Sequence, residues 1–258
     1  MREIENIFVN SMEDFMREMV PQLGFQRNPI YRGQASDVWS VLPPLFREEV
    51  AKSEFKSWNE LEGAFLLRLK QRARGELGYD PTTELEWMSI GQHYGLPTRL
   101  STWSENALVA LYFATSPHCD DDGVVWRILL GEAELTISHD YEQVPEQVRV
   151  YMPQNTTPAM LNQQTCYLSH PLPDQDAAPE TLEDYFELGD DRIHLARIII
   201  PAEEKAFLRR RLSMMGFDSR KLFPGMHGLC EQISEEIYHH TQTFEWVFPD
   251  SEADSEAA

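Results

Sequence analysis

The sequence predicts an α+β fold in which a small central β-sheet is flanked by helices from the N-terminal and C-terminal parts of the chain. Helix-start signatures cluster in the first half, two long apolar runs typical of buried strands lie further along, and helical segments close the chain. This order favours the α+β class. The 258 residues, 42% of them hydrophobic, suffice for one core. We therefore predict a single domain over residues 1–245, with its core at about 10–240.

Each helix expected in the first half begins at a side chain that can cap it. An N-cap hydroxyl accepts a hydrogen bond from a free backbone N–H of the first turn, and a glutamate three residues later completes a capping box. The expected caps are Ser11 for a helix that ends before Pro21, Ser57 for 58–74, Thr83 for 84–94 and Ser104 for 105–115. The third helix is expected to pack Tyr94 and to stop at Gly95, and the fourth is apolar enough to be buried.

The expected strands are short or nearly continuous apolar runs. They cover 29–33, 123–130, 165–169 and 194–200. Helices are expected at 202–215, with Gly216 following the last turn, and at 226–239. A solvent-exposed insertion is expected near 172–180, and the acidic tail 246–258 is expected to be disordered, because its last nine residues hold no hydrophobic residue larger than alanine.

The formal charge of −21 argues against broad binding to nucleic acid backbones. Residues 172–191 hold eight acids and no Lys or Arg, and 250–258 hold four more acids. Two basic clusters, 68–74 and 205–211, are read as solvated helix faces or as sites for an anionic ligand. No apolar stretch is long enough to span a membrane, and the N-terminus lacks the apolar region of a secretory signal. Three widely spaced cysteines favour reduced thiols and a cytoplasmic location.

No generic catalytic motif is present in the sequence. There is no P-loop, GxGxxG, HExxH or GxSxG motif, and no His or Cys spacing predicts a metal site. Two clusters are nevertheless unusual. In the first, Arg32, Gly33 and Gln34 end an apolar strand. The arginine can grip phosphate or carboxylate with two hydrogen bonds, and the glycine lets a ligand or another backbone approach closely. The alternative is a structural ion pair of Arg32.

The second cluster is the loop Gln92–Arg99, in which polar side chains crowd a helix end that passes into glycine and proline. Loops held between buried helices commonly carry function. The alternative is a tight connection in which His93 caps backbone carbonyls. The residues alone leave both readings open.

These two clusters resemble the FRG domain family of bacteria and phages, which is named for an aromatic-Arg-Gly triplet. The first cluster is Tyr31-Arg-Gly-Gln34, followed by Trp39 and Leu42-Pro43. The second is Gln92-His-Tyr-Gly-Leu-Pro-Thr-Arg-Leu100, followed by Trp103 and the helix Ala110-Leu-Tyr-Phe-Ala114. With Pro201, Leu222-Phe-Pro224 and Gly228-Leu229, the resemblance spans about 10–240, so the predicted domain is a single FRG domain.

The chain departs from the family pattern at two places. Family members usually carry an aspartate where this chain has Thr102. Their central motif has an arginine, then a glutamine and a glycine, whereas Ala159–Gln164 keeps only Gln163 or Gln164. A divergent member, or one with altered chemistry, is consistent with both changes.

The family's layout is similar to that of ADP-ribosyltransferases, so the resemblance implies an ADP-ribosyltransferase-like fold with NAD as substrate and no metal. It places Arg32 on the NAD phosphates, with Gly33, Gln34, His93, Tyr94 and Arg99 around the nucleotide. Thr98, with Tyr94 or Ser101 nearby, would lie beside the nicotinamide, and Gln164 or Gln163 near the reacting ribose. The expected protein is a toxin or anti-phage defence effector that modifies a protein or nucleic acid acceptor.

The alternative is a non-catalytic protein-binding module of a toxin–antitoxin or defence system. In that case Arg32, His93 and Arg99 would form a buried polar network, and the acidic surface would meet a partner such as an antitoxin. A nuclease is disfavoured, because the sequence lacks the carboxylate cluster that a metal pair needs. The two readings differ in geometry: the enzyme requires Arg32, Thr98 and Gln163 or Gln164 around one open cleft.

Overall fold

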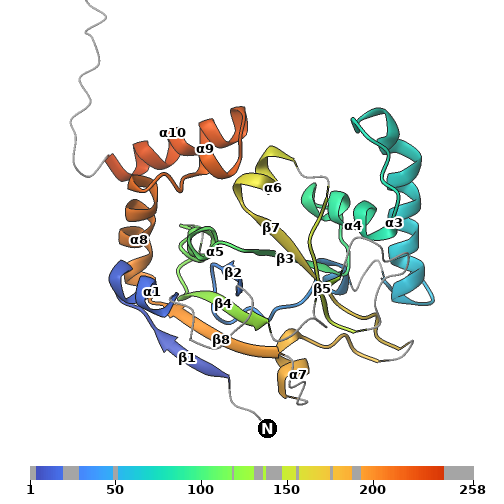
Figure 1. Ribbon diagram of the computed structural model, residues 1–258, viewed down its shortest axis with the longest axis horizontal. Helices are drawn as coiled ribbons and strands as arrows, with labels where there is room; N and C mark the ends of the chain where they lie inside the picture. The colour runs from blue at the N-terminus through green and yellow to red at the C-terminus, as the bar shows by residue number, and fades with distance from the viewer. Residues whose placement is uncertain are drawn as a thin grey trace, which may run out of the picture.

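The computed structural model describes residues 4–19, 29–48, 52–117, 119–130, 136–137, 147–154, 157–174, 177–187 and 193–240 (Figure 1). In this part of the chain eight strands form one mixed sheet in the order β1-β8-β4-β2-β3-β7-β6-β5. The strands are β1 (Glu5–Phe8), β2 (Ile30–Gln34), β3 (Leu100–Ser104), β4 (Gly123–Leu130), β5 (Thr136–Ile137), β6 (Arg149–Tyr151), β7 (Thr165–Ser169) and β8 (Ile193–Ile200). The α+β class is confirmed, but the sheet is larger than the small one predicted.

Helices precede, interrupt and follow the strands. They are α1 (Met12–Glu18), α3 (Trp58–Arg72), α4 (Glu84–His93), α5 (Ala107–Ala114), α6 (Pro158–Asn162), α7 (Leu182–Glu187), α8 (Ala202–Met214), α9 (Ser219–Leu222) and α10 (Met226–His240), with 3-10 turns η1 (Pro44–Arg47) and η2 (Ala73–Gly75). Ser11, Ser57 and Thr83 cap α1, α3 and α4 as predicted, and Thr83 forms a full capping box with Glu86.

The two halves of the sheet meet at a weak junction. Five residue pairs join β2 to β4, and five join β3 to β7. Between β2 and β3, in contrast, only Tyr31 and Ser104 are paired. The two central strands therefore part beyond this pair. Because backbone groups that leave a ladder need other partners, this gap is a natural place for side chains from β2 to reach β3.

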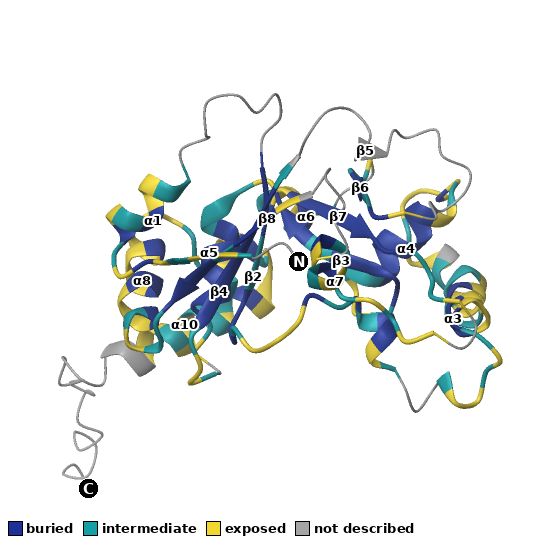
Figure 2. Cartoon of the chain, turned by 90° about the horizontal axis from the view of Figure 1, so that it is seen from below, coloured by how far each residue is buried: buried dark blue, intermediate teal, exposed yellow. Residues whose placement is uncertain are grey.

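Two groups of helices pack on the sheet, one on each side of the junction (Figures 1 and 2). Side chains of α1, α5, α8 and α9 form one buried cluster with Tyr31, Val125 and Ile198. Side chains of α3, α4 and α6 form another with Leu100 and Tyr167. Alternate strand residues, such as Ile30 and Trp126, form a third cluster that includes Val41 of the segment after β2 and Leu182 of α7.

Some local expectations were wrong. Helix α5 is capped by Asn106, whose side chain accepts from the backbone N–H of Leu108, and Ser104 instead ends β3. The hydroxyl of Ser104 is engaged elsewhere, since it donates to the carbonyl oxygen of Gln163 at 2.6 Å. Tyr94, expected to pack, is 71% exposed, because α4 ends before it and Gly95 turns the chain with a φ of 87°. The acidic tail 246–258 lies outside the described residues.

Candidate functional site

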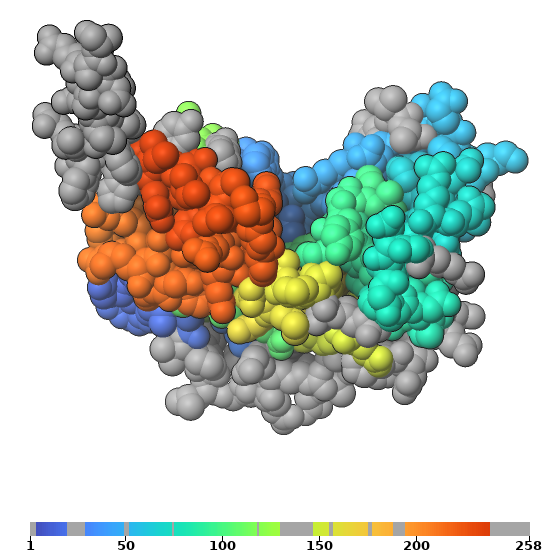
Figure 3. Space-filling view, turned by 90° about the horizontal axis from the view of Figure 1, so that it is seen from above, coloured from blue at the N-terminus to red at the C-terminus, as the bar shows by residue number. Residues whose placement is uncertain are grey.

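A cavity of about 570 Å³ lies over the β2–β3 junction, between the two groups of helices. Figure 3 shows the molecule hollowed between the C-terminal helices, in red, and α4, in green. The polar lining of the cavity consists of Arg32, Gln92, His93, Thr102, Ser104, Gln163, Thr165 and His227. Aromatic and apolar lining comes from Tyr31, Tyr94, Trp103, Val109, Ala110, Phe113, Ala159, Tyr167, Phe223 and Pro224. A mostly apolar cavity with a few convergent polar groups is typical of a small-molecule site.

Arg32 is the only arginine or lysine of this lining among the described residues. Its side chain crosses the gap between the parted strands, and its Nη1 donates to the carbonyl oxygen of Thr102 at 2.7 Å. Its buried Nε has no hydrogen-bond partner, and no carboxylate pairs with Arg32 within the part of the chain that the structure describes. The structural ion pair considered from the sequence is therefore not seen for this residue in the described ranges.

The surroundings of Arg32 are unfavourable for a lone cation. Burial, and secondarily the charge of Arg47, lower the pKa of Arg32 to about 10, and Glu183 opposes this only in part. Burial and the neighbouring Arg32 lower the pKa of His170 to about 3, so this histidine is neutral at pH 7. Arg32 itself stays charged at pH 7. A buried cation without an anion is costly, and an anionic ligand would relieve that cost.

On the opposite side of the junction, the end of α6 and the start of β7 each bring one polar side chain to the cavity. Gln163 is buried, and its Nε2 donates to the carbonyl oxygen of Leu222 at 2.9 Å, which ties α6 to α9. Thr165 is 8% exposed, and its hydroxyl has no partner among the described residues. A buried hydroxyl without a partner at a cavity wall is a group available to a ligand.

His93 and Tyr94 form the wall at the end of α4. The Nε2 of His93 lies 2.9 Å from the hydroxyl of Thr157, which caps α6, and burial lowers the pKa of His93. His93 is thus neutral at pH 7. Tyr94 packs edge-on against it, with ring centroids 4.9 Å apart. These side chains connect α4 and α6 across one edge of the cavity.

The structure brings together five of the residues predicted for the site: Arg32, Gly33, His93, Tyr94 and Gln163 all line the cavity. Gly33 lies against α5, where a Cβ atom would overlap the carbonyl oxygen of Ala110. The close approach expected there is that of another backbone rather than of a ligand.

Four other predicted residues lie away from the cavity lining. Gln34 accepts from the indole of Trp126 at 2.6 Å, and the fully buried Thr98 donates to Gln92 at 2.9 Å. Arg99 forms a buried ion pair with Glu62. Gln164 is exposed, with a left-handed φ of 46°, so that its neighbour Gln163 faces inward instead. The geometry gives these four no contact with a ligand in this cavity. Of the residues that the enzyme reading requires around one cleft, Arg32 and Gln163 therefore line it and Thr98 does not.

Sequence reasoning missed several lining residues. Thr102 was singled out only as a departure from a family pattern, yet it contributes both the cavity wall and the carbonyl that accepts from Arg32. Thr165 begins a strand that was predicted, but the fact that its hydroxyl lacks a partner is visible only in three dimensions. Phe223 and Pro224 come from the turn between α9 and α10, and His227 from the first turn of α10. That turn reaches the cavity through tertiary packing alone.

No group of three or more His, Cys, Asp or Glu side chains that could hold a metal ion occurs among the described residues. In the same ranges, no helix is both long and apolar enough to cross a membrane. Cys119, Cys166 and Cys230 are all free thiols.

Residues 27–123 match the family model of the FRG domain. This range contains both motifs that carry the resemblance and supplies Arg32, Gly33, His93, Tyr94 and Thr102 to the cavity, whereas Gln163 and Thr165 lie beyond it. The matched range is shorter than the span of about 10–240 expected from the sequence. No curated protein and no solved structure matches the chain.

Proposed function

The chain carries an FRG domain, and from this premise and the geometry of the cavity we propose that it is an NAD-dependent ADP-ribosyltransferase. The observation that carries the proposal is Arg32, a residue in the lining of a cavity of about 570 Å³, with a buried, unpartnered Nε and no paired acid among the described residues. A diphosphate is the kind of group that such a fixed cation binds, through two parallel hydrogen bonds.

The placement of the polar groups supports NAD in particular. The layout implied by the family resemblance has an arginine on a first strand, a Ser, Thr or Tyr on a second motif and a Glu or Gln on a third. Here Arg32, Thr102 and Thr165 lie on β2, β3 and β7, which are neighbours in the sheet, with Gln163 just before β7. We assign Arg32 to the diphosphate, Tyr94 and Thr102 to the nicotinamide, and Gln163 with Thr165 to the reacting ribose.

The reaction requires little proton transfer from the protein. The bond between the nicotinamide nitrogen and C1′ of the ribose breaks, and its electron pair leaves with neutral nicotinamide. An acceptor oxygen or nitrogen then bonds to C1′ and releases its proton. The protein mainly has to clamp the diphosphate and orient the ribose. Arg32 and Gln163 both line the cavity, which supports giving them these two roles. The apolar walls limit the access of water to the oxocarbenium-like state.

The described lining of the cavity contains no aspartate or glutamate. A neutral Gln163 stabilises positive charge on the ribose less than a glutamate would. We therefore expect transfer to be slow. We also expect a nucleic acid acceptor rather than fast modification of proteins. Such an activity would suit a toxin or an anti-phage defence effector acting in the cytoplasm, held in check by a partner such as an antitoxin.

The absence of a carboxylate from the described lining also favours the second candidate, a module that binds NAD or a protein partner without turnover. The buried network predicted for that reading does not form among the described residues, however. Arg32 donates to Thr102, His93 contacts Thr157, and Arg99 pairs with Glu62, so these three side chains are engaged separately.

A transfer assay with ³²P-labelled NAD and protein, DNA and RNA acceptors tests the proposal. We expect the wild type to transfer label and to melt at a higher temperature with NAD, and Arg32→Gln to lose transfer by about 100-fold or more, as when one transition-state donor is removed. The control is Arg17→Gln, since the exposed guanidinium of Arg17 pairs with Asp14 at 3.0 Å and does not line the cavity.

Three results would count against the proposal. Transfer that survives Arg32→Gln would reject this site and leave the activity standing. If the folded wild type shows no transfer and is not stabilised by NAD, the proposed function itself is rejected. Stabilisation by NAD without transfer would identify the non-catalytic module.

Thr165 provides a test in which stability and binding move in opposite directions. Thr165→Val keeps the shape but removes a buried hydroxyl that has no partner, so we expect the free energy of unfolding to rise by about 1 kcal/mol. NAD affinity is expected to fall by about tenfold, the equivalent of one lost hydrogen bond. Both are measurable by urea unfolding and by calorimetric titration.

The matched control for this test is Thr115→Val. The buried Thr115 hydroxyl donates to the carbonyls of Leu111 at 2.8 Å and Tyr112 at 3.2 Å, outside the cavity. Its loss should destabilise the protein by about 1 kcal/mol and leave NAD affinity unchanged. If both variants lose stability equally, the Thr165 hydroxyl has a partner in the free protein and is not waiting for a ligand.

A further inference from the structure

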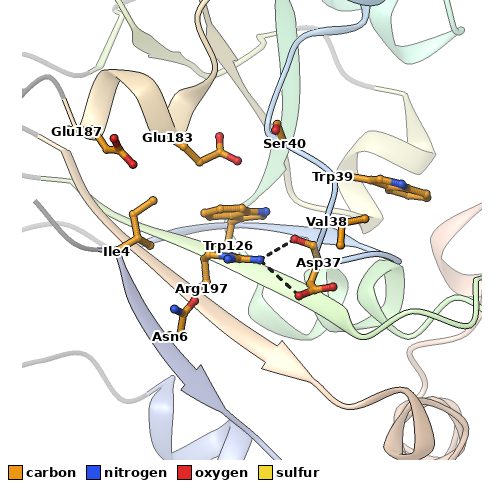
Figure 4. Close-up of a pocket in the computed structure, with 10 residues that line it drawn as sticks. All are labelled: Ile4, Asn6, Asp37, Val38, Trp39, Ser40, Trp126, Glu183, Glu187 and Arg197. Atoms are coloured by element: carbon orange, nitrogen blue, oxygen red, sulfur yellow. Dashed lines mark hydrogen bonds and ion pairs between the residues drawn. The ribbon is translucent and has the colours of Figure 1, made fainter. Parts of the chain in front are cut away.

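A cavity of about 660 Å³ lies over β1, β4 and β8, apart from the one that contains Arg32 (Figure 4). Two charged side chains of its lining already have partners. Nη2 of Arg197 lies 3.6 Å from the Asp37 carboxylate, and both oxygens of Glu183 accept from the backbone N–H of Val41 at 3.2 Å. A clearer unsatisfied feature of the described surface is apolar and lies on helix α10.

Helix α10 turns apolar side chains outward. Figure 3 shows the helix, in red, at the surface of the molecule. Spacings of four, three and four residues place one row of side chains on a single face of the helix, and we call this row the α10 stripe: Met226, Cys230, Ile233 and Ile237. All four are exposed, Met226 by 71%, Ile233 by 46% and Ile237 by 43%.

The opposite face of α10 packs on the rest of the molecule. Gly228 is buried there, and a Cβ atom on it would overlap the carbonyl oxygen of Phe223. Two helical turns later, Glu235 pairs with Arg209 of α8 at 2.5 Å. Because these contacts hold the helix from one side, the α10 stripe faces away from the described part of the chain. A surface helix normally presents polar side chains in this direction, so the stripe is an apolar surface without a cover among the described residues.

A second copy of the chain is a poor cover for the α10 stripe. Four side chains along one helix fall well short of the about 800 Å² per partner that a stable interface buries. Two copies that each carry a net charge of −21 also repel each other. A segment of the same chain needs far less contact area, because its tether keeps it at a high effective concentration.

An apolar segment follows α10 in the sequence. Residues 241–258 lie outside the described ranges, and they contain Phe244-Glu-Trp-Val-Phe248, which begins after a spacer of three residues, 241–243. In an extended segment alternate side chains share one side, so the three aromatic rings would face the same way. A spacer of three residues is long enough to reverse the chain after a helix.

The segment matches the α10 stripe in length and in chemistry. Five extended residues span about 16 Å, and an α-helix rises by about 17 Å between Met226 and Ile237. Aromatic rings also make favourable contacts with sulfur, which Met226 and Cys230 supply to the stripe.

We propose that residues 244–248 fold back along α10 in an extended conformation and cover the α10 stripe. The segment runs antiparallel to the helix, since it starts from the helix's C-terminal end, so that Phe244 lies nearest Ile237 and Phe248 nearest Met226. Residues 249–258 then form the acidic tail, which is shorter than the tail expected from the sequence. The inference is independent of the function proposed above.

The rate at which iodoacetamide labels the Cys230 thiol tests the proposal, because this thiol lies within the stripe. Peptide mass spectrometry of the folded full chain follows Cys230 and, as an internal reference, Cys119, which lies outside α10. The test variant is Phe244→Ser/Trp246→Ser/Phe248→Ser. We expect its Cys230 to label about tenfold or more faster than that of the wild type, since burial of a single aromatic ring already favours the docked state by about that factor. Cys119 should label at the same rate in both proteins.

The matched control, Glu252→Gln/Asp254→Asn/Glu256→Gln, carries the same number of substitutions in the same part of the chain but keeps the three rings. Its Cys230 should label like that of the wild type. A gain as large as in the aromatic variant would show that the acids slow the thiol, and would overturn the proposal. Equal Cys230 rates in the wild type and the aromatic variant would overturn it as well. Protection of Cys230 that is lost on dilution would assign the cover to a second copy instead.

Discussion

Glu62→Gln is expected to lower the free energy of unfolding by about 3–5 kcal/mol, the usual effect of breaking a buried ion pair from one side. The Glu62 carboxylate, 2% exposed on α3, accepts from Nε of Arg99 at 2.7 Å, from its Nη2, and from its backbone N–H at 3.0 Å. A glutamine keeps one acceptor but leaves the guanidinium without its counter-charge. The loss is measured as a lower urea midpoint with an unchanged slope.

Two further variants sharpen this result. Lys70→Gln, on the same helix, breaks the exposed pair of Lys70 with Glu84 and should change stability by less than about 1 kcal/mol. Glu62→Leu/Arg99→Met should recover part of the loss, because no buried charge is left unpaired. If Glu62→Gln lowers the free energy of unfolding no more than Lys70→Gln does, Arg99 is solvated in solution. Arg99 would then be available to a ligand, as the sequence predicted.

Sequence signals predicted elements of the fold well where they depend only on residues that are adjacent in the sequence. Ser57 and Thr83 act as caps because an N-cap needs only a side chain and the next three residues. The run 165–169 is a strand with the predicted bounds. By contrast, β3 reads Leu-Ser-Thr-Trp-Ser and has no continuous apolar run, so it was missed. Its two serines are buried by neighbours from distant parts of the chain, which periodicity does not report.

The residues predicted for the candidate site also include some that the structure supports and some that it does not. Arg32, His93 and Gln163 could be singled out because their residue types and positions at element ends are unusual. Thr98 and Arg99 were singled out for the same reason, yet they lie in the core with partners 6 and 37 residues away. An arginine that pairs with a buried glutamate and one that lacks an acid look alike in sequence. Only the tertiary position of Glu62 separates them.

Gly33→Ala is the second substitution with a large expected effect, about 3 kcal/mol or more, at the upper end for overpacking. A Cβ atom at Gly33 would overlap the carbonyl oxygen of Ala110 and lie 2.8 Å from the backbone nitrogen of Ala114. These are backbone atoms of α5, so relief requires the whole helix to move. The control is Gly63→Ala, in the interior of α3, where a Cβ meets nothing within 4 Å and should stabilise by about 0.5–1 kcal/mol.

The comparison of Gly33→Ala with Gly63→Ala also tests why a glycine follows Arg32. Helix α5 supplies Val109, Ala110 and Phe113 to the cavity, so a displaced α5 would change the cavity wall as well as the core. If Gly33 serves helix packing, Gly33→Ala lowers stability whether or not NAD is present, and NAD affinity falls only as far as the wall moves. If it instead served ligand approach, stability without NAD would stay near the wild-type value while affinity collapsed. The overlap with Ala110 argues for packing, which makes the glycine the residue that sets the distance between Arg32's strand and the cavity wall.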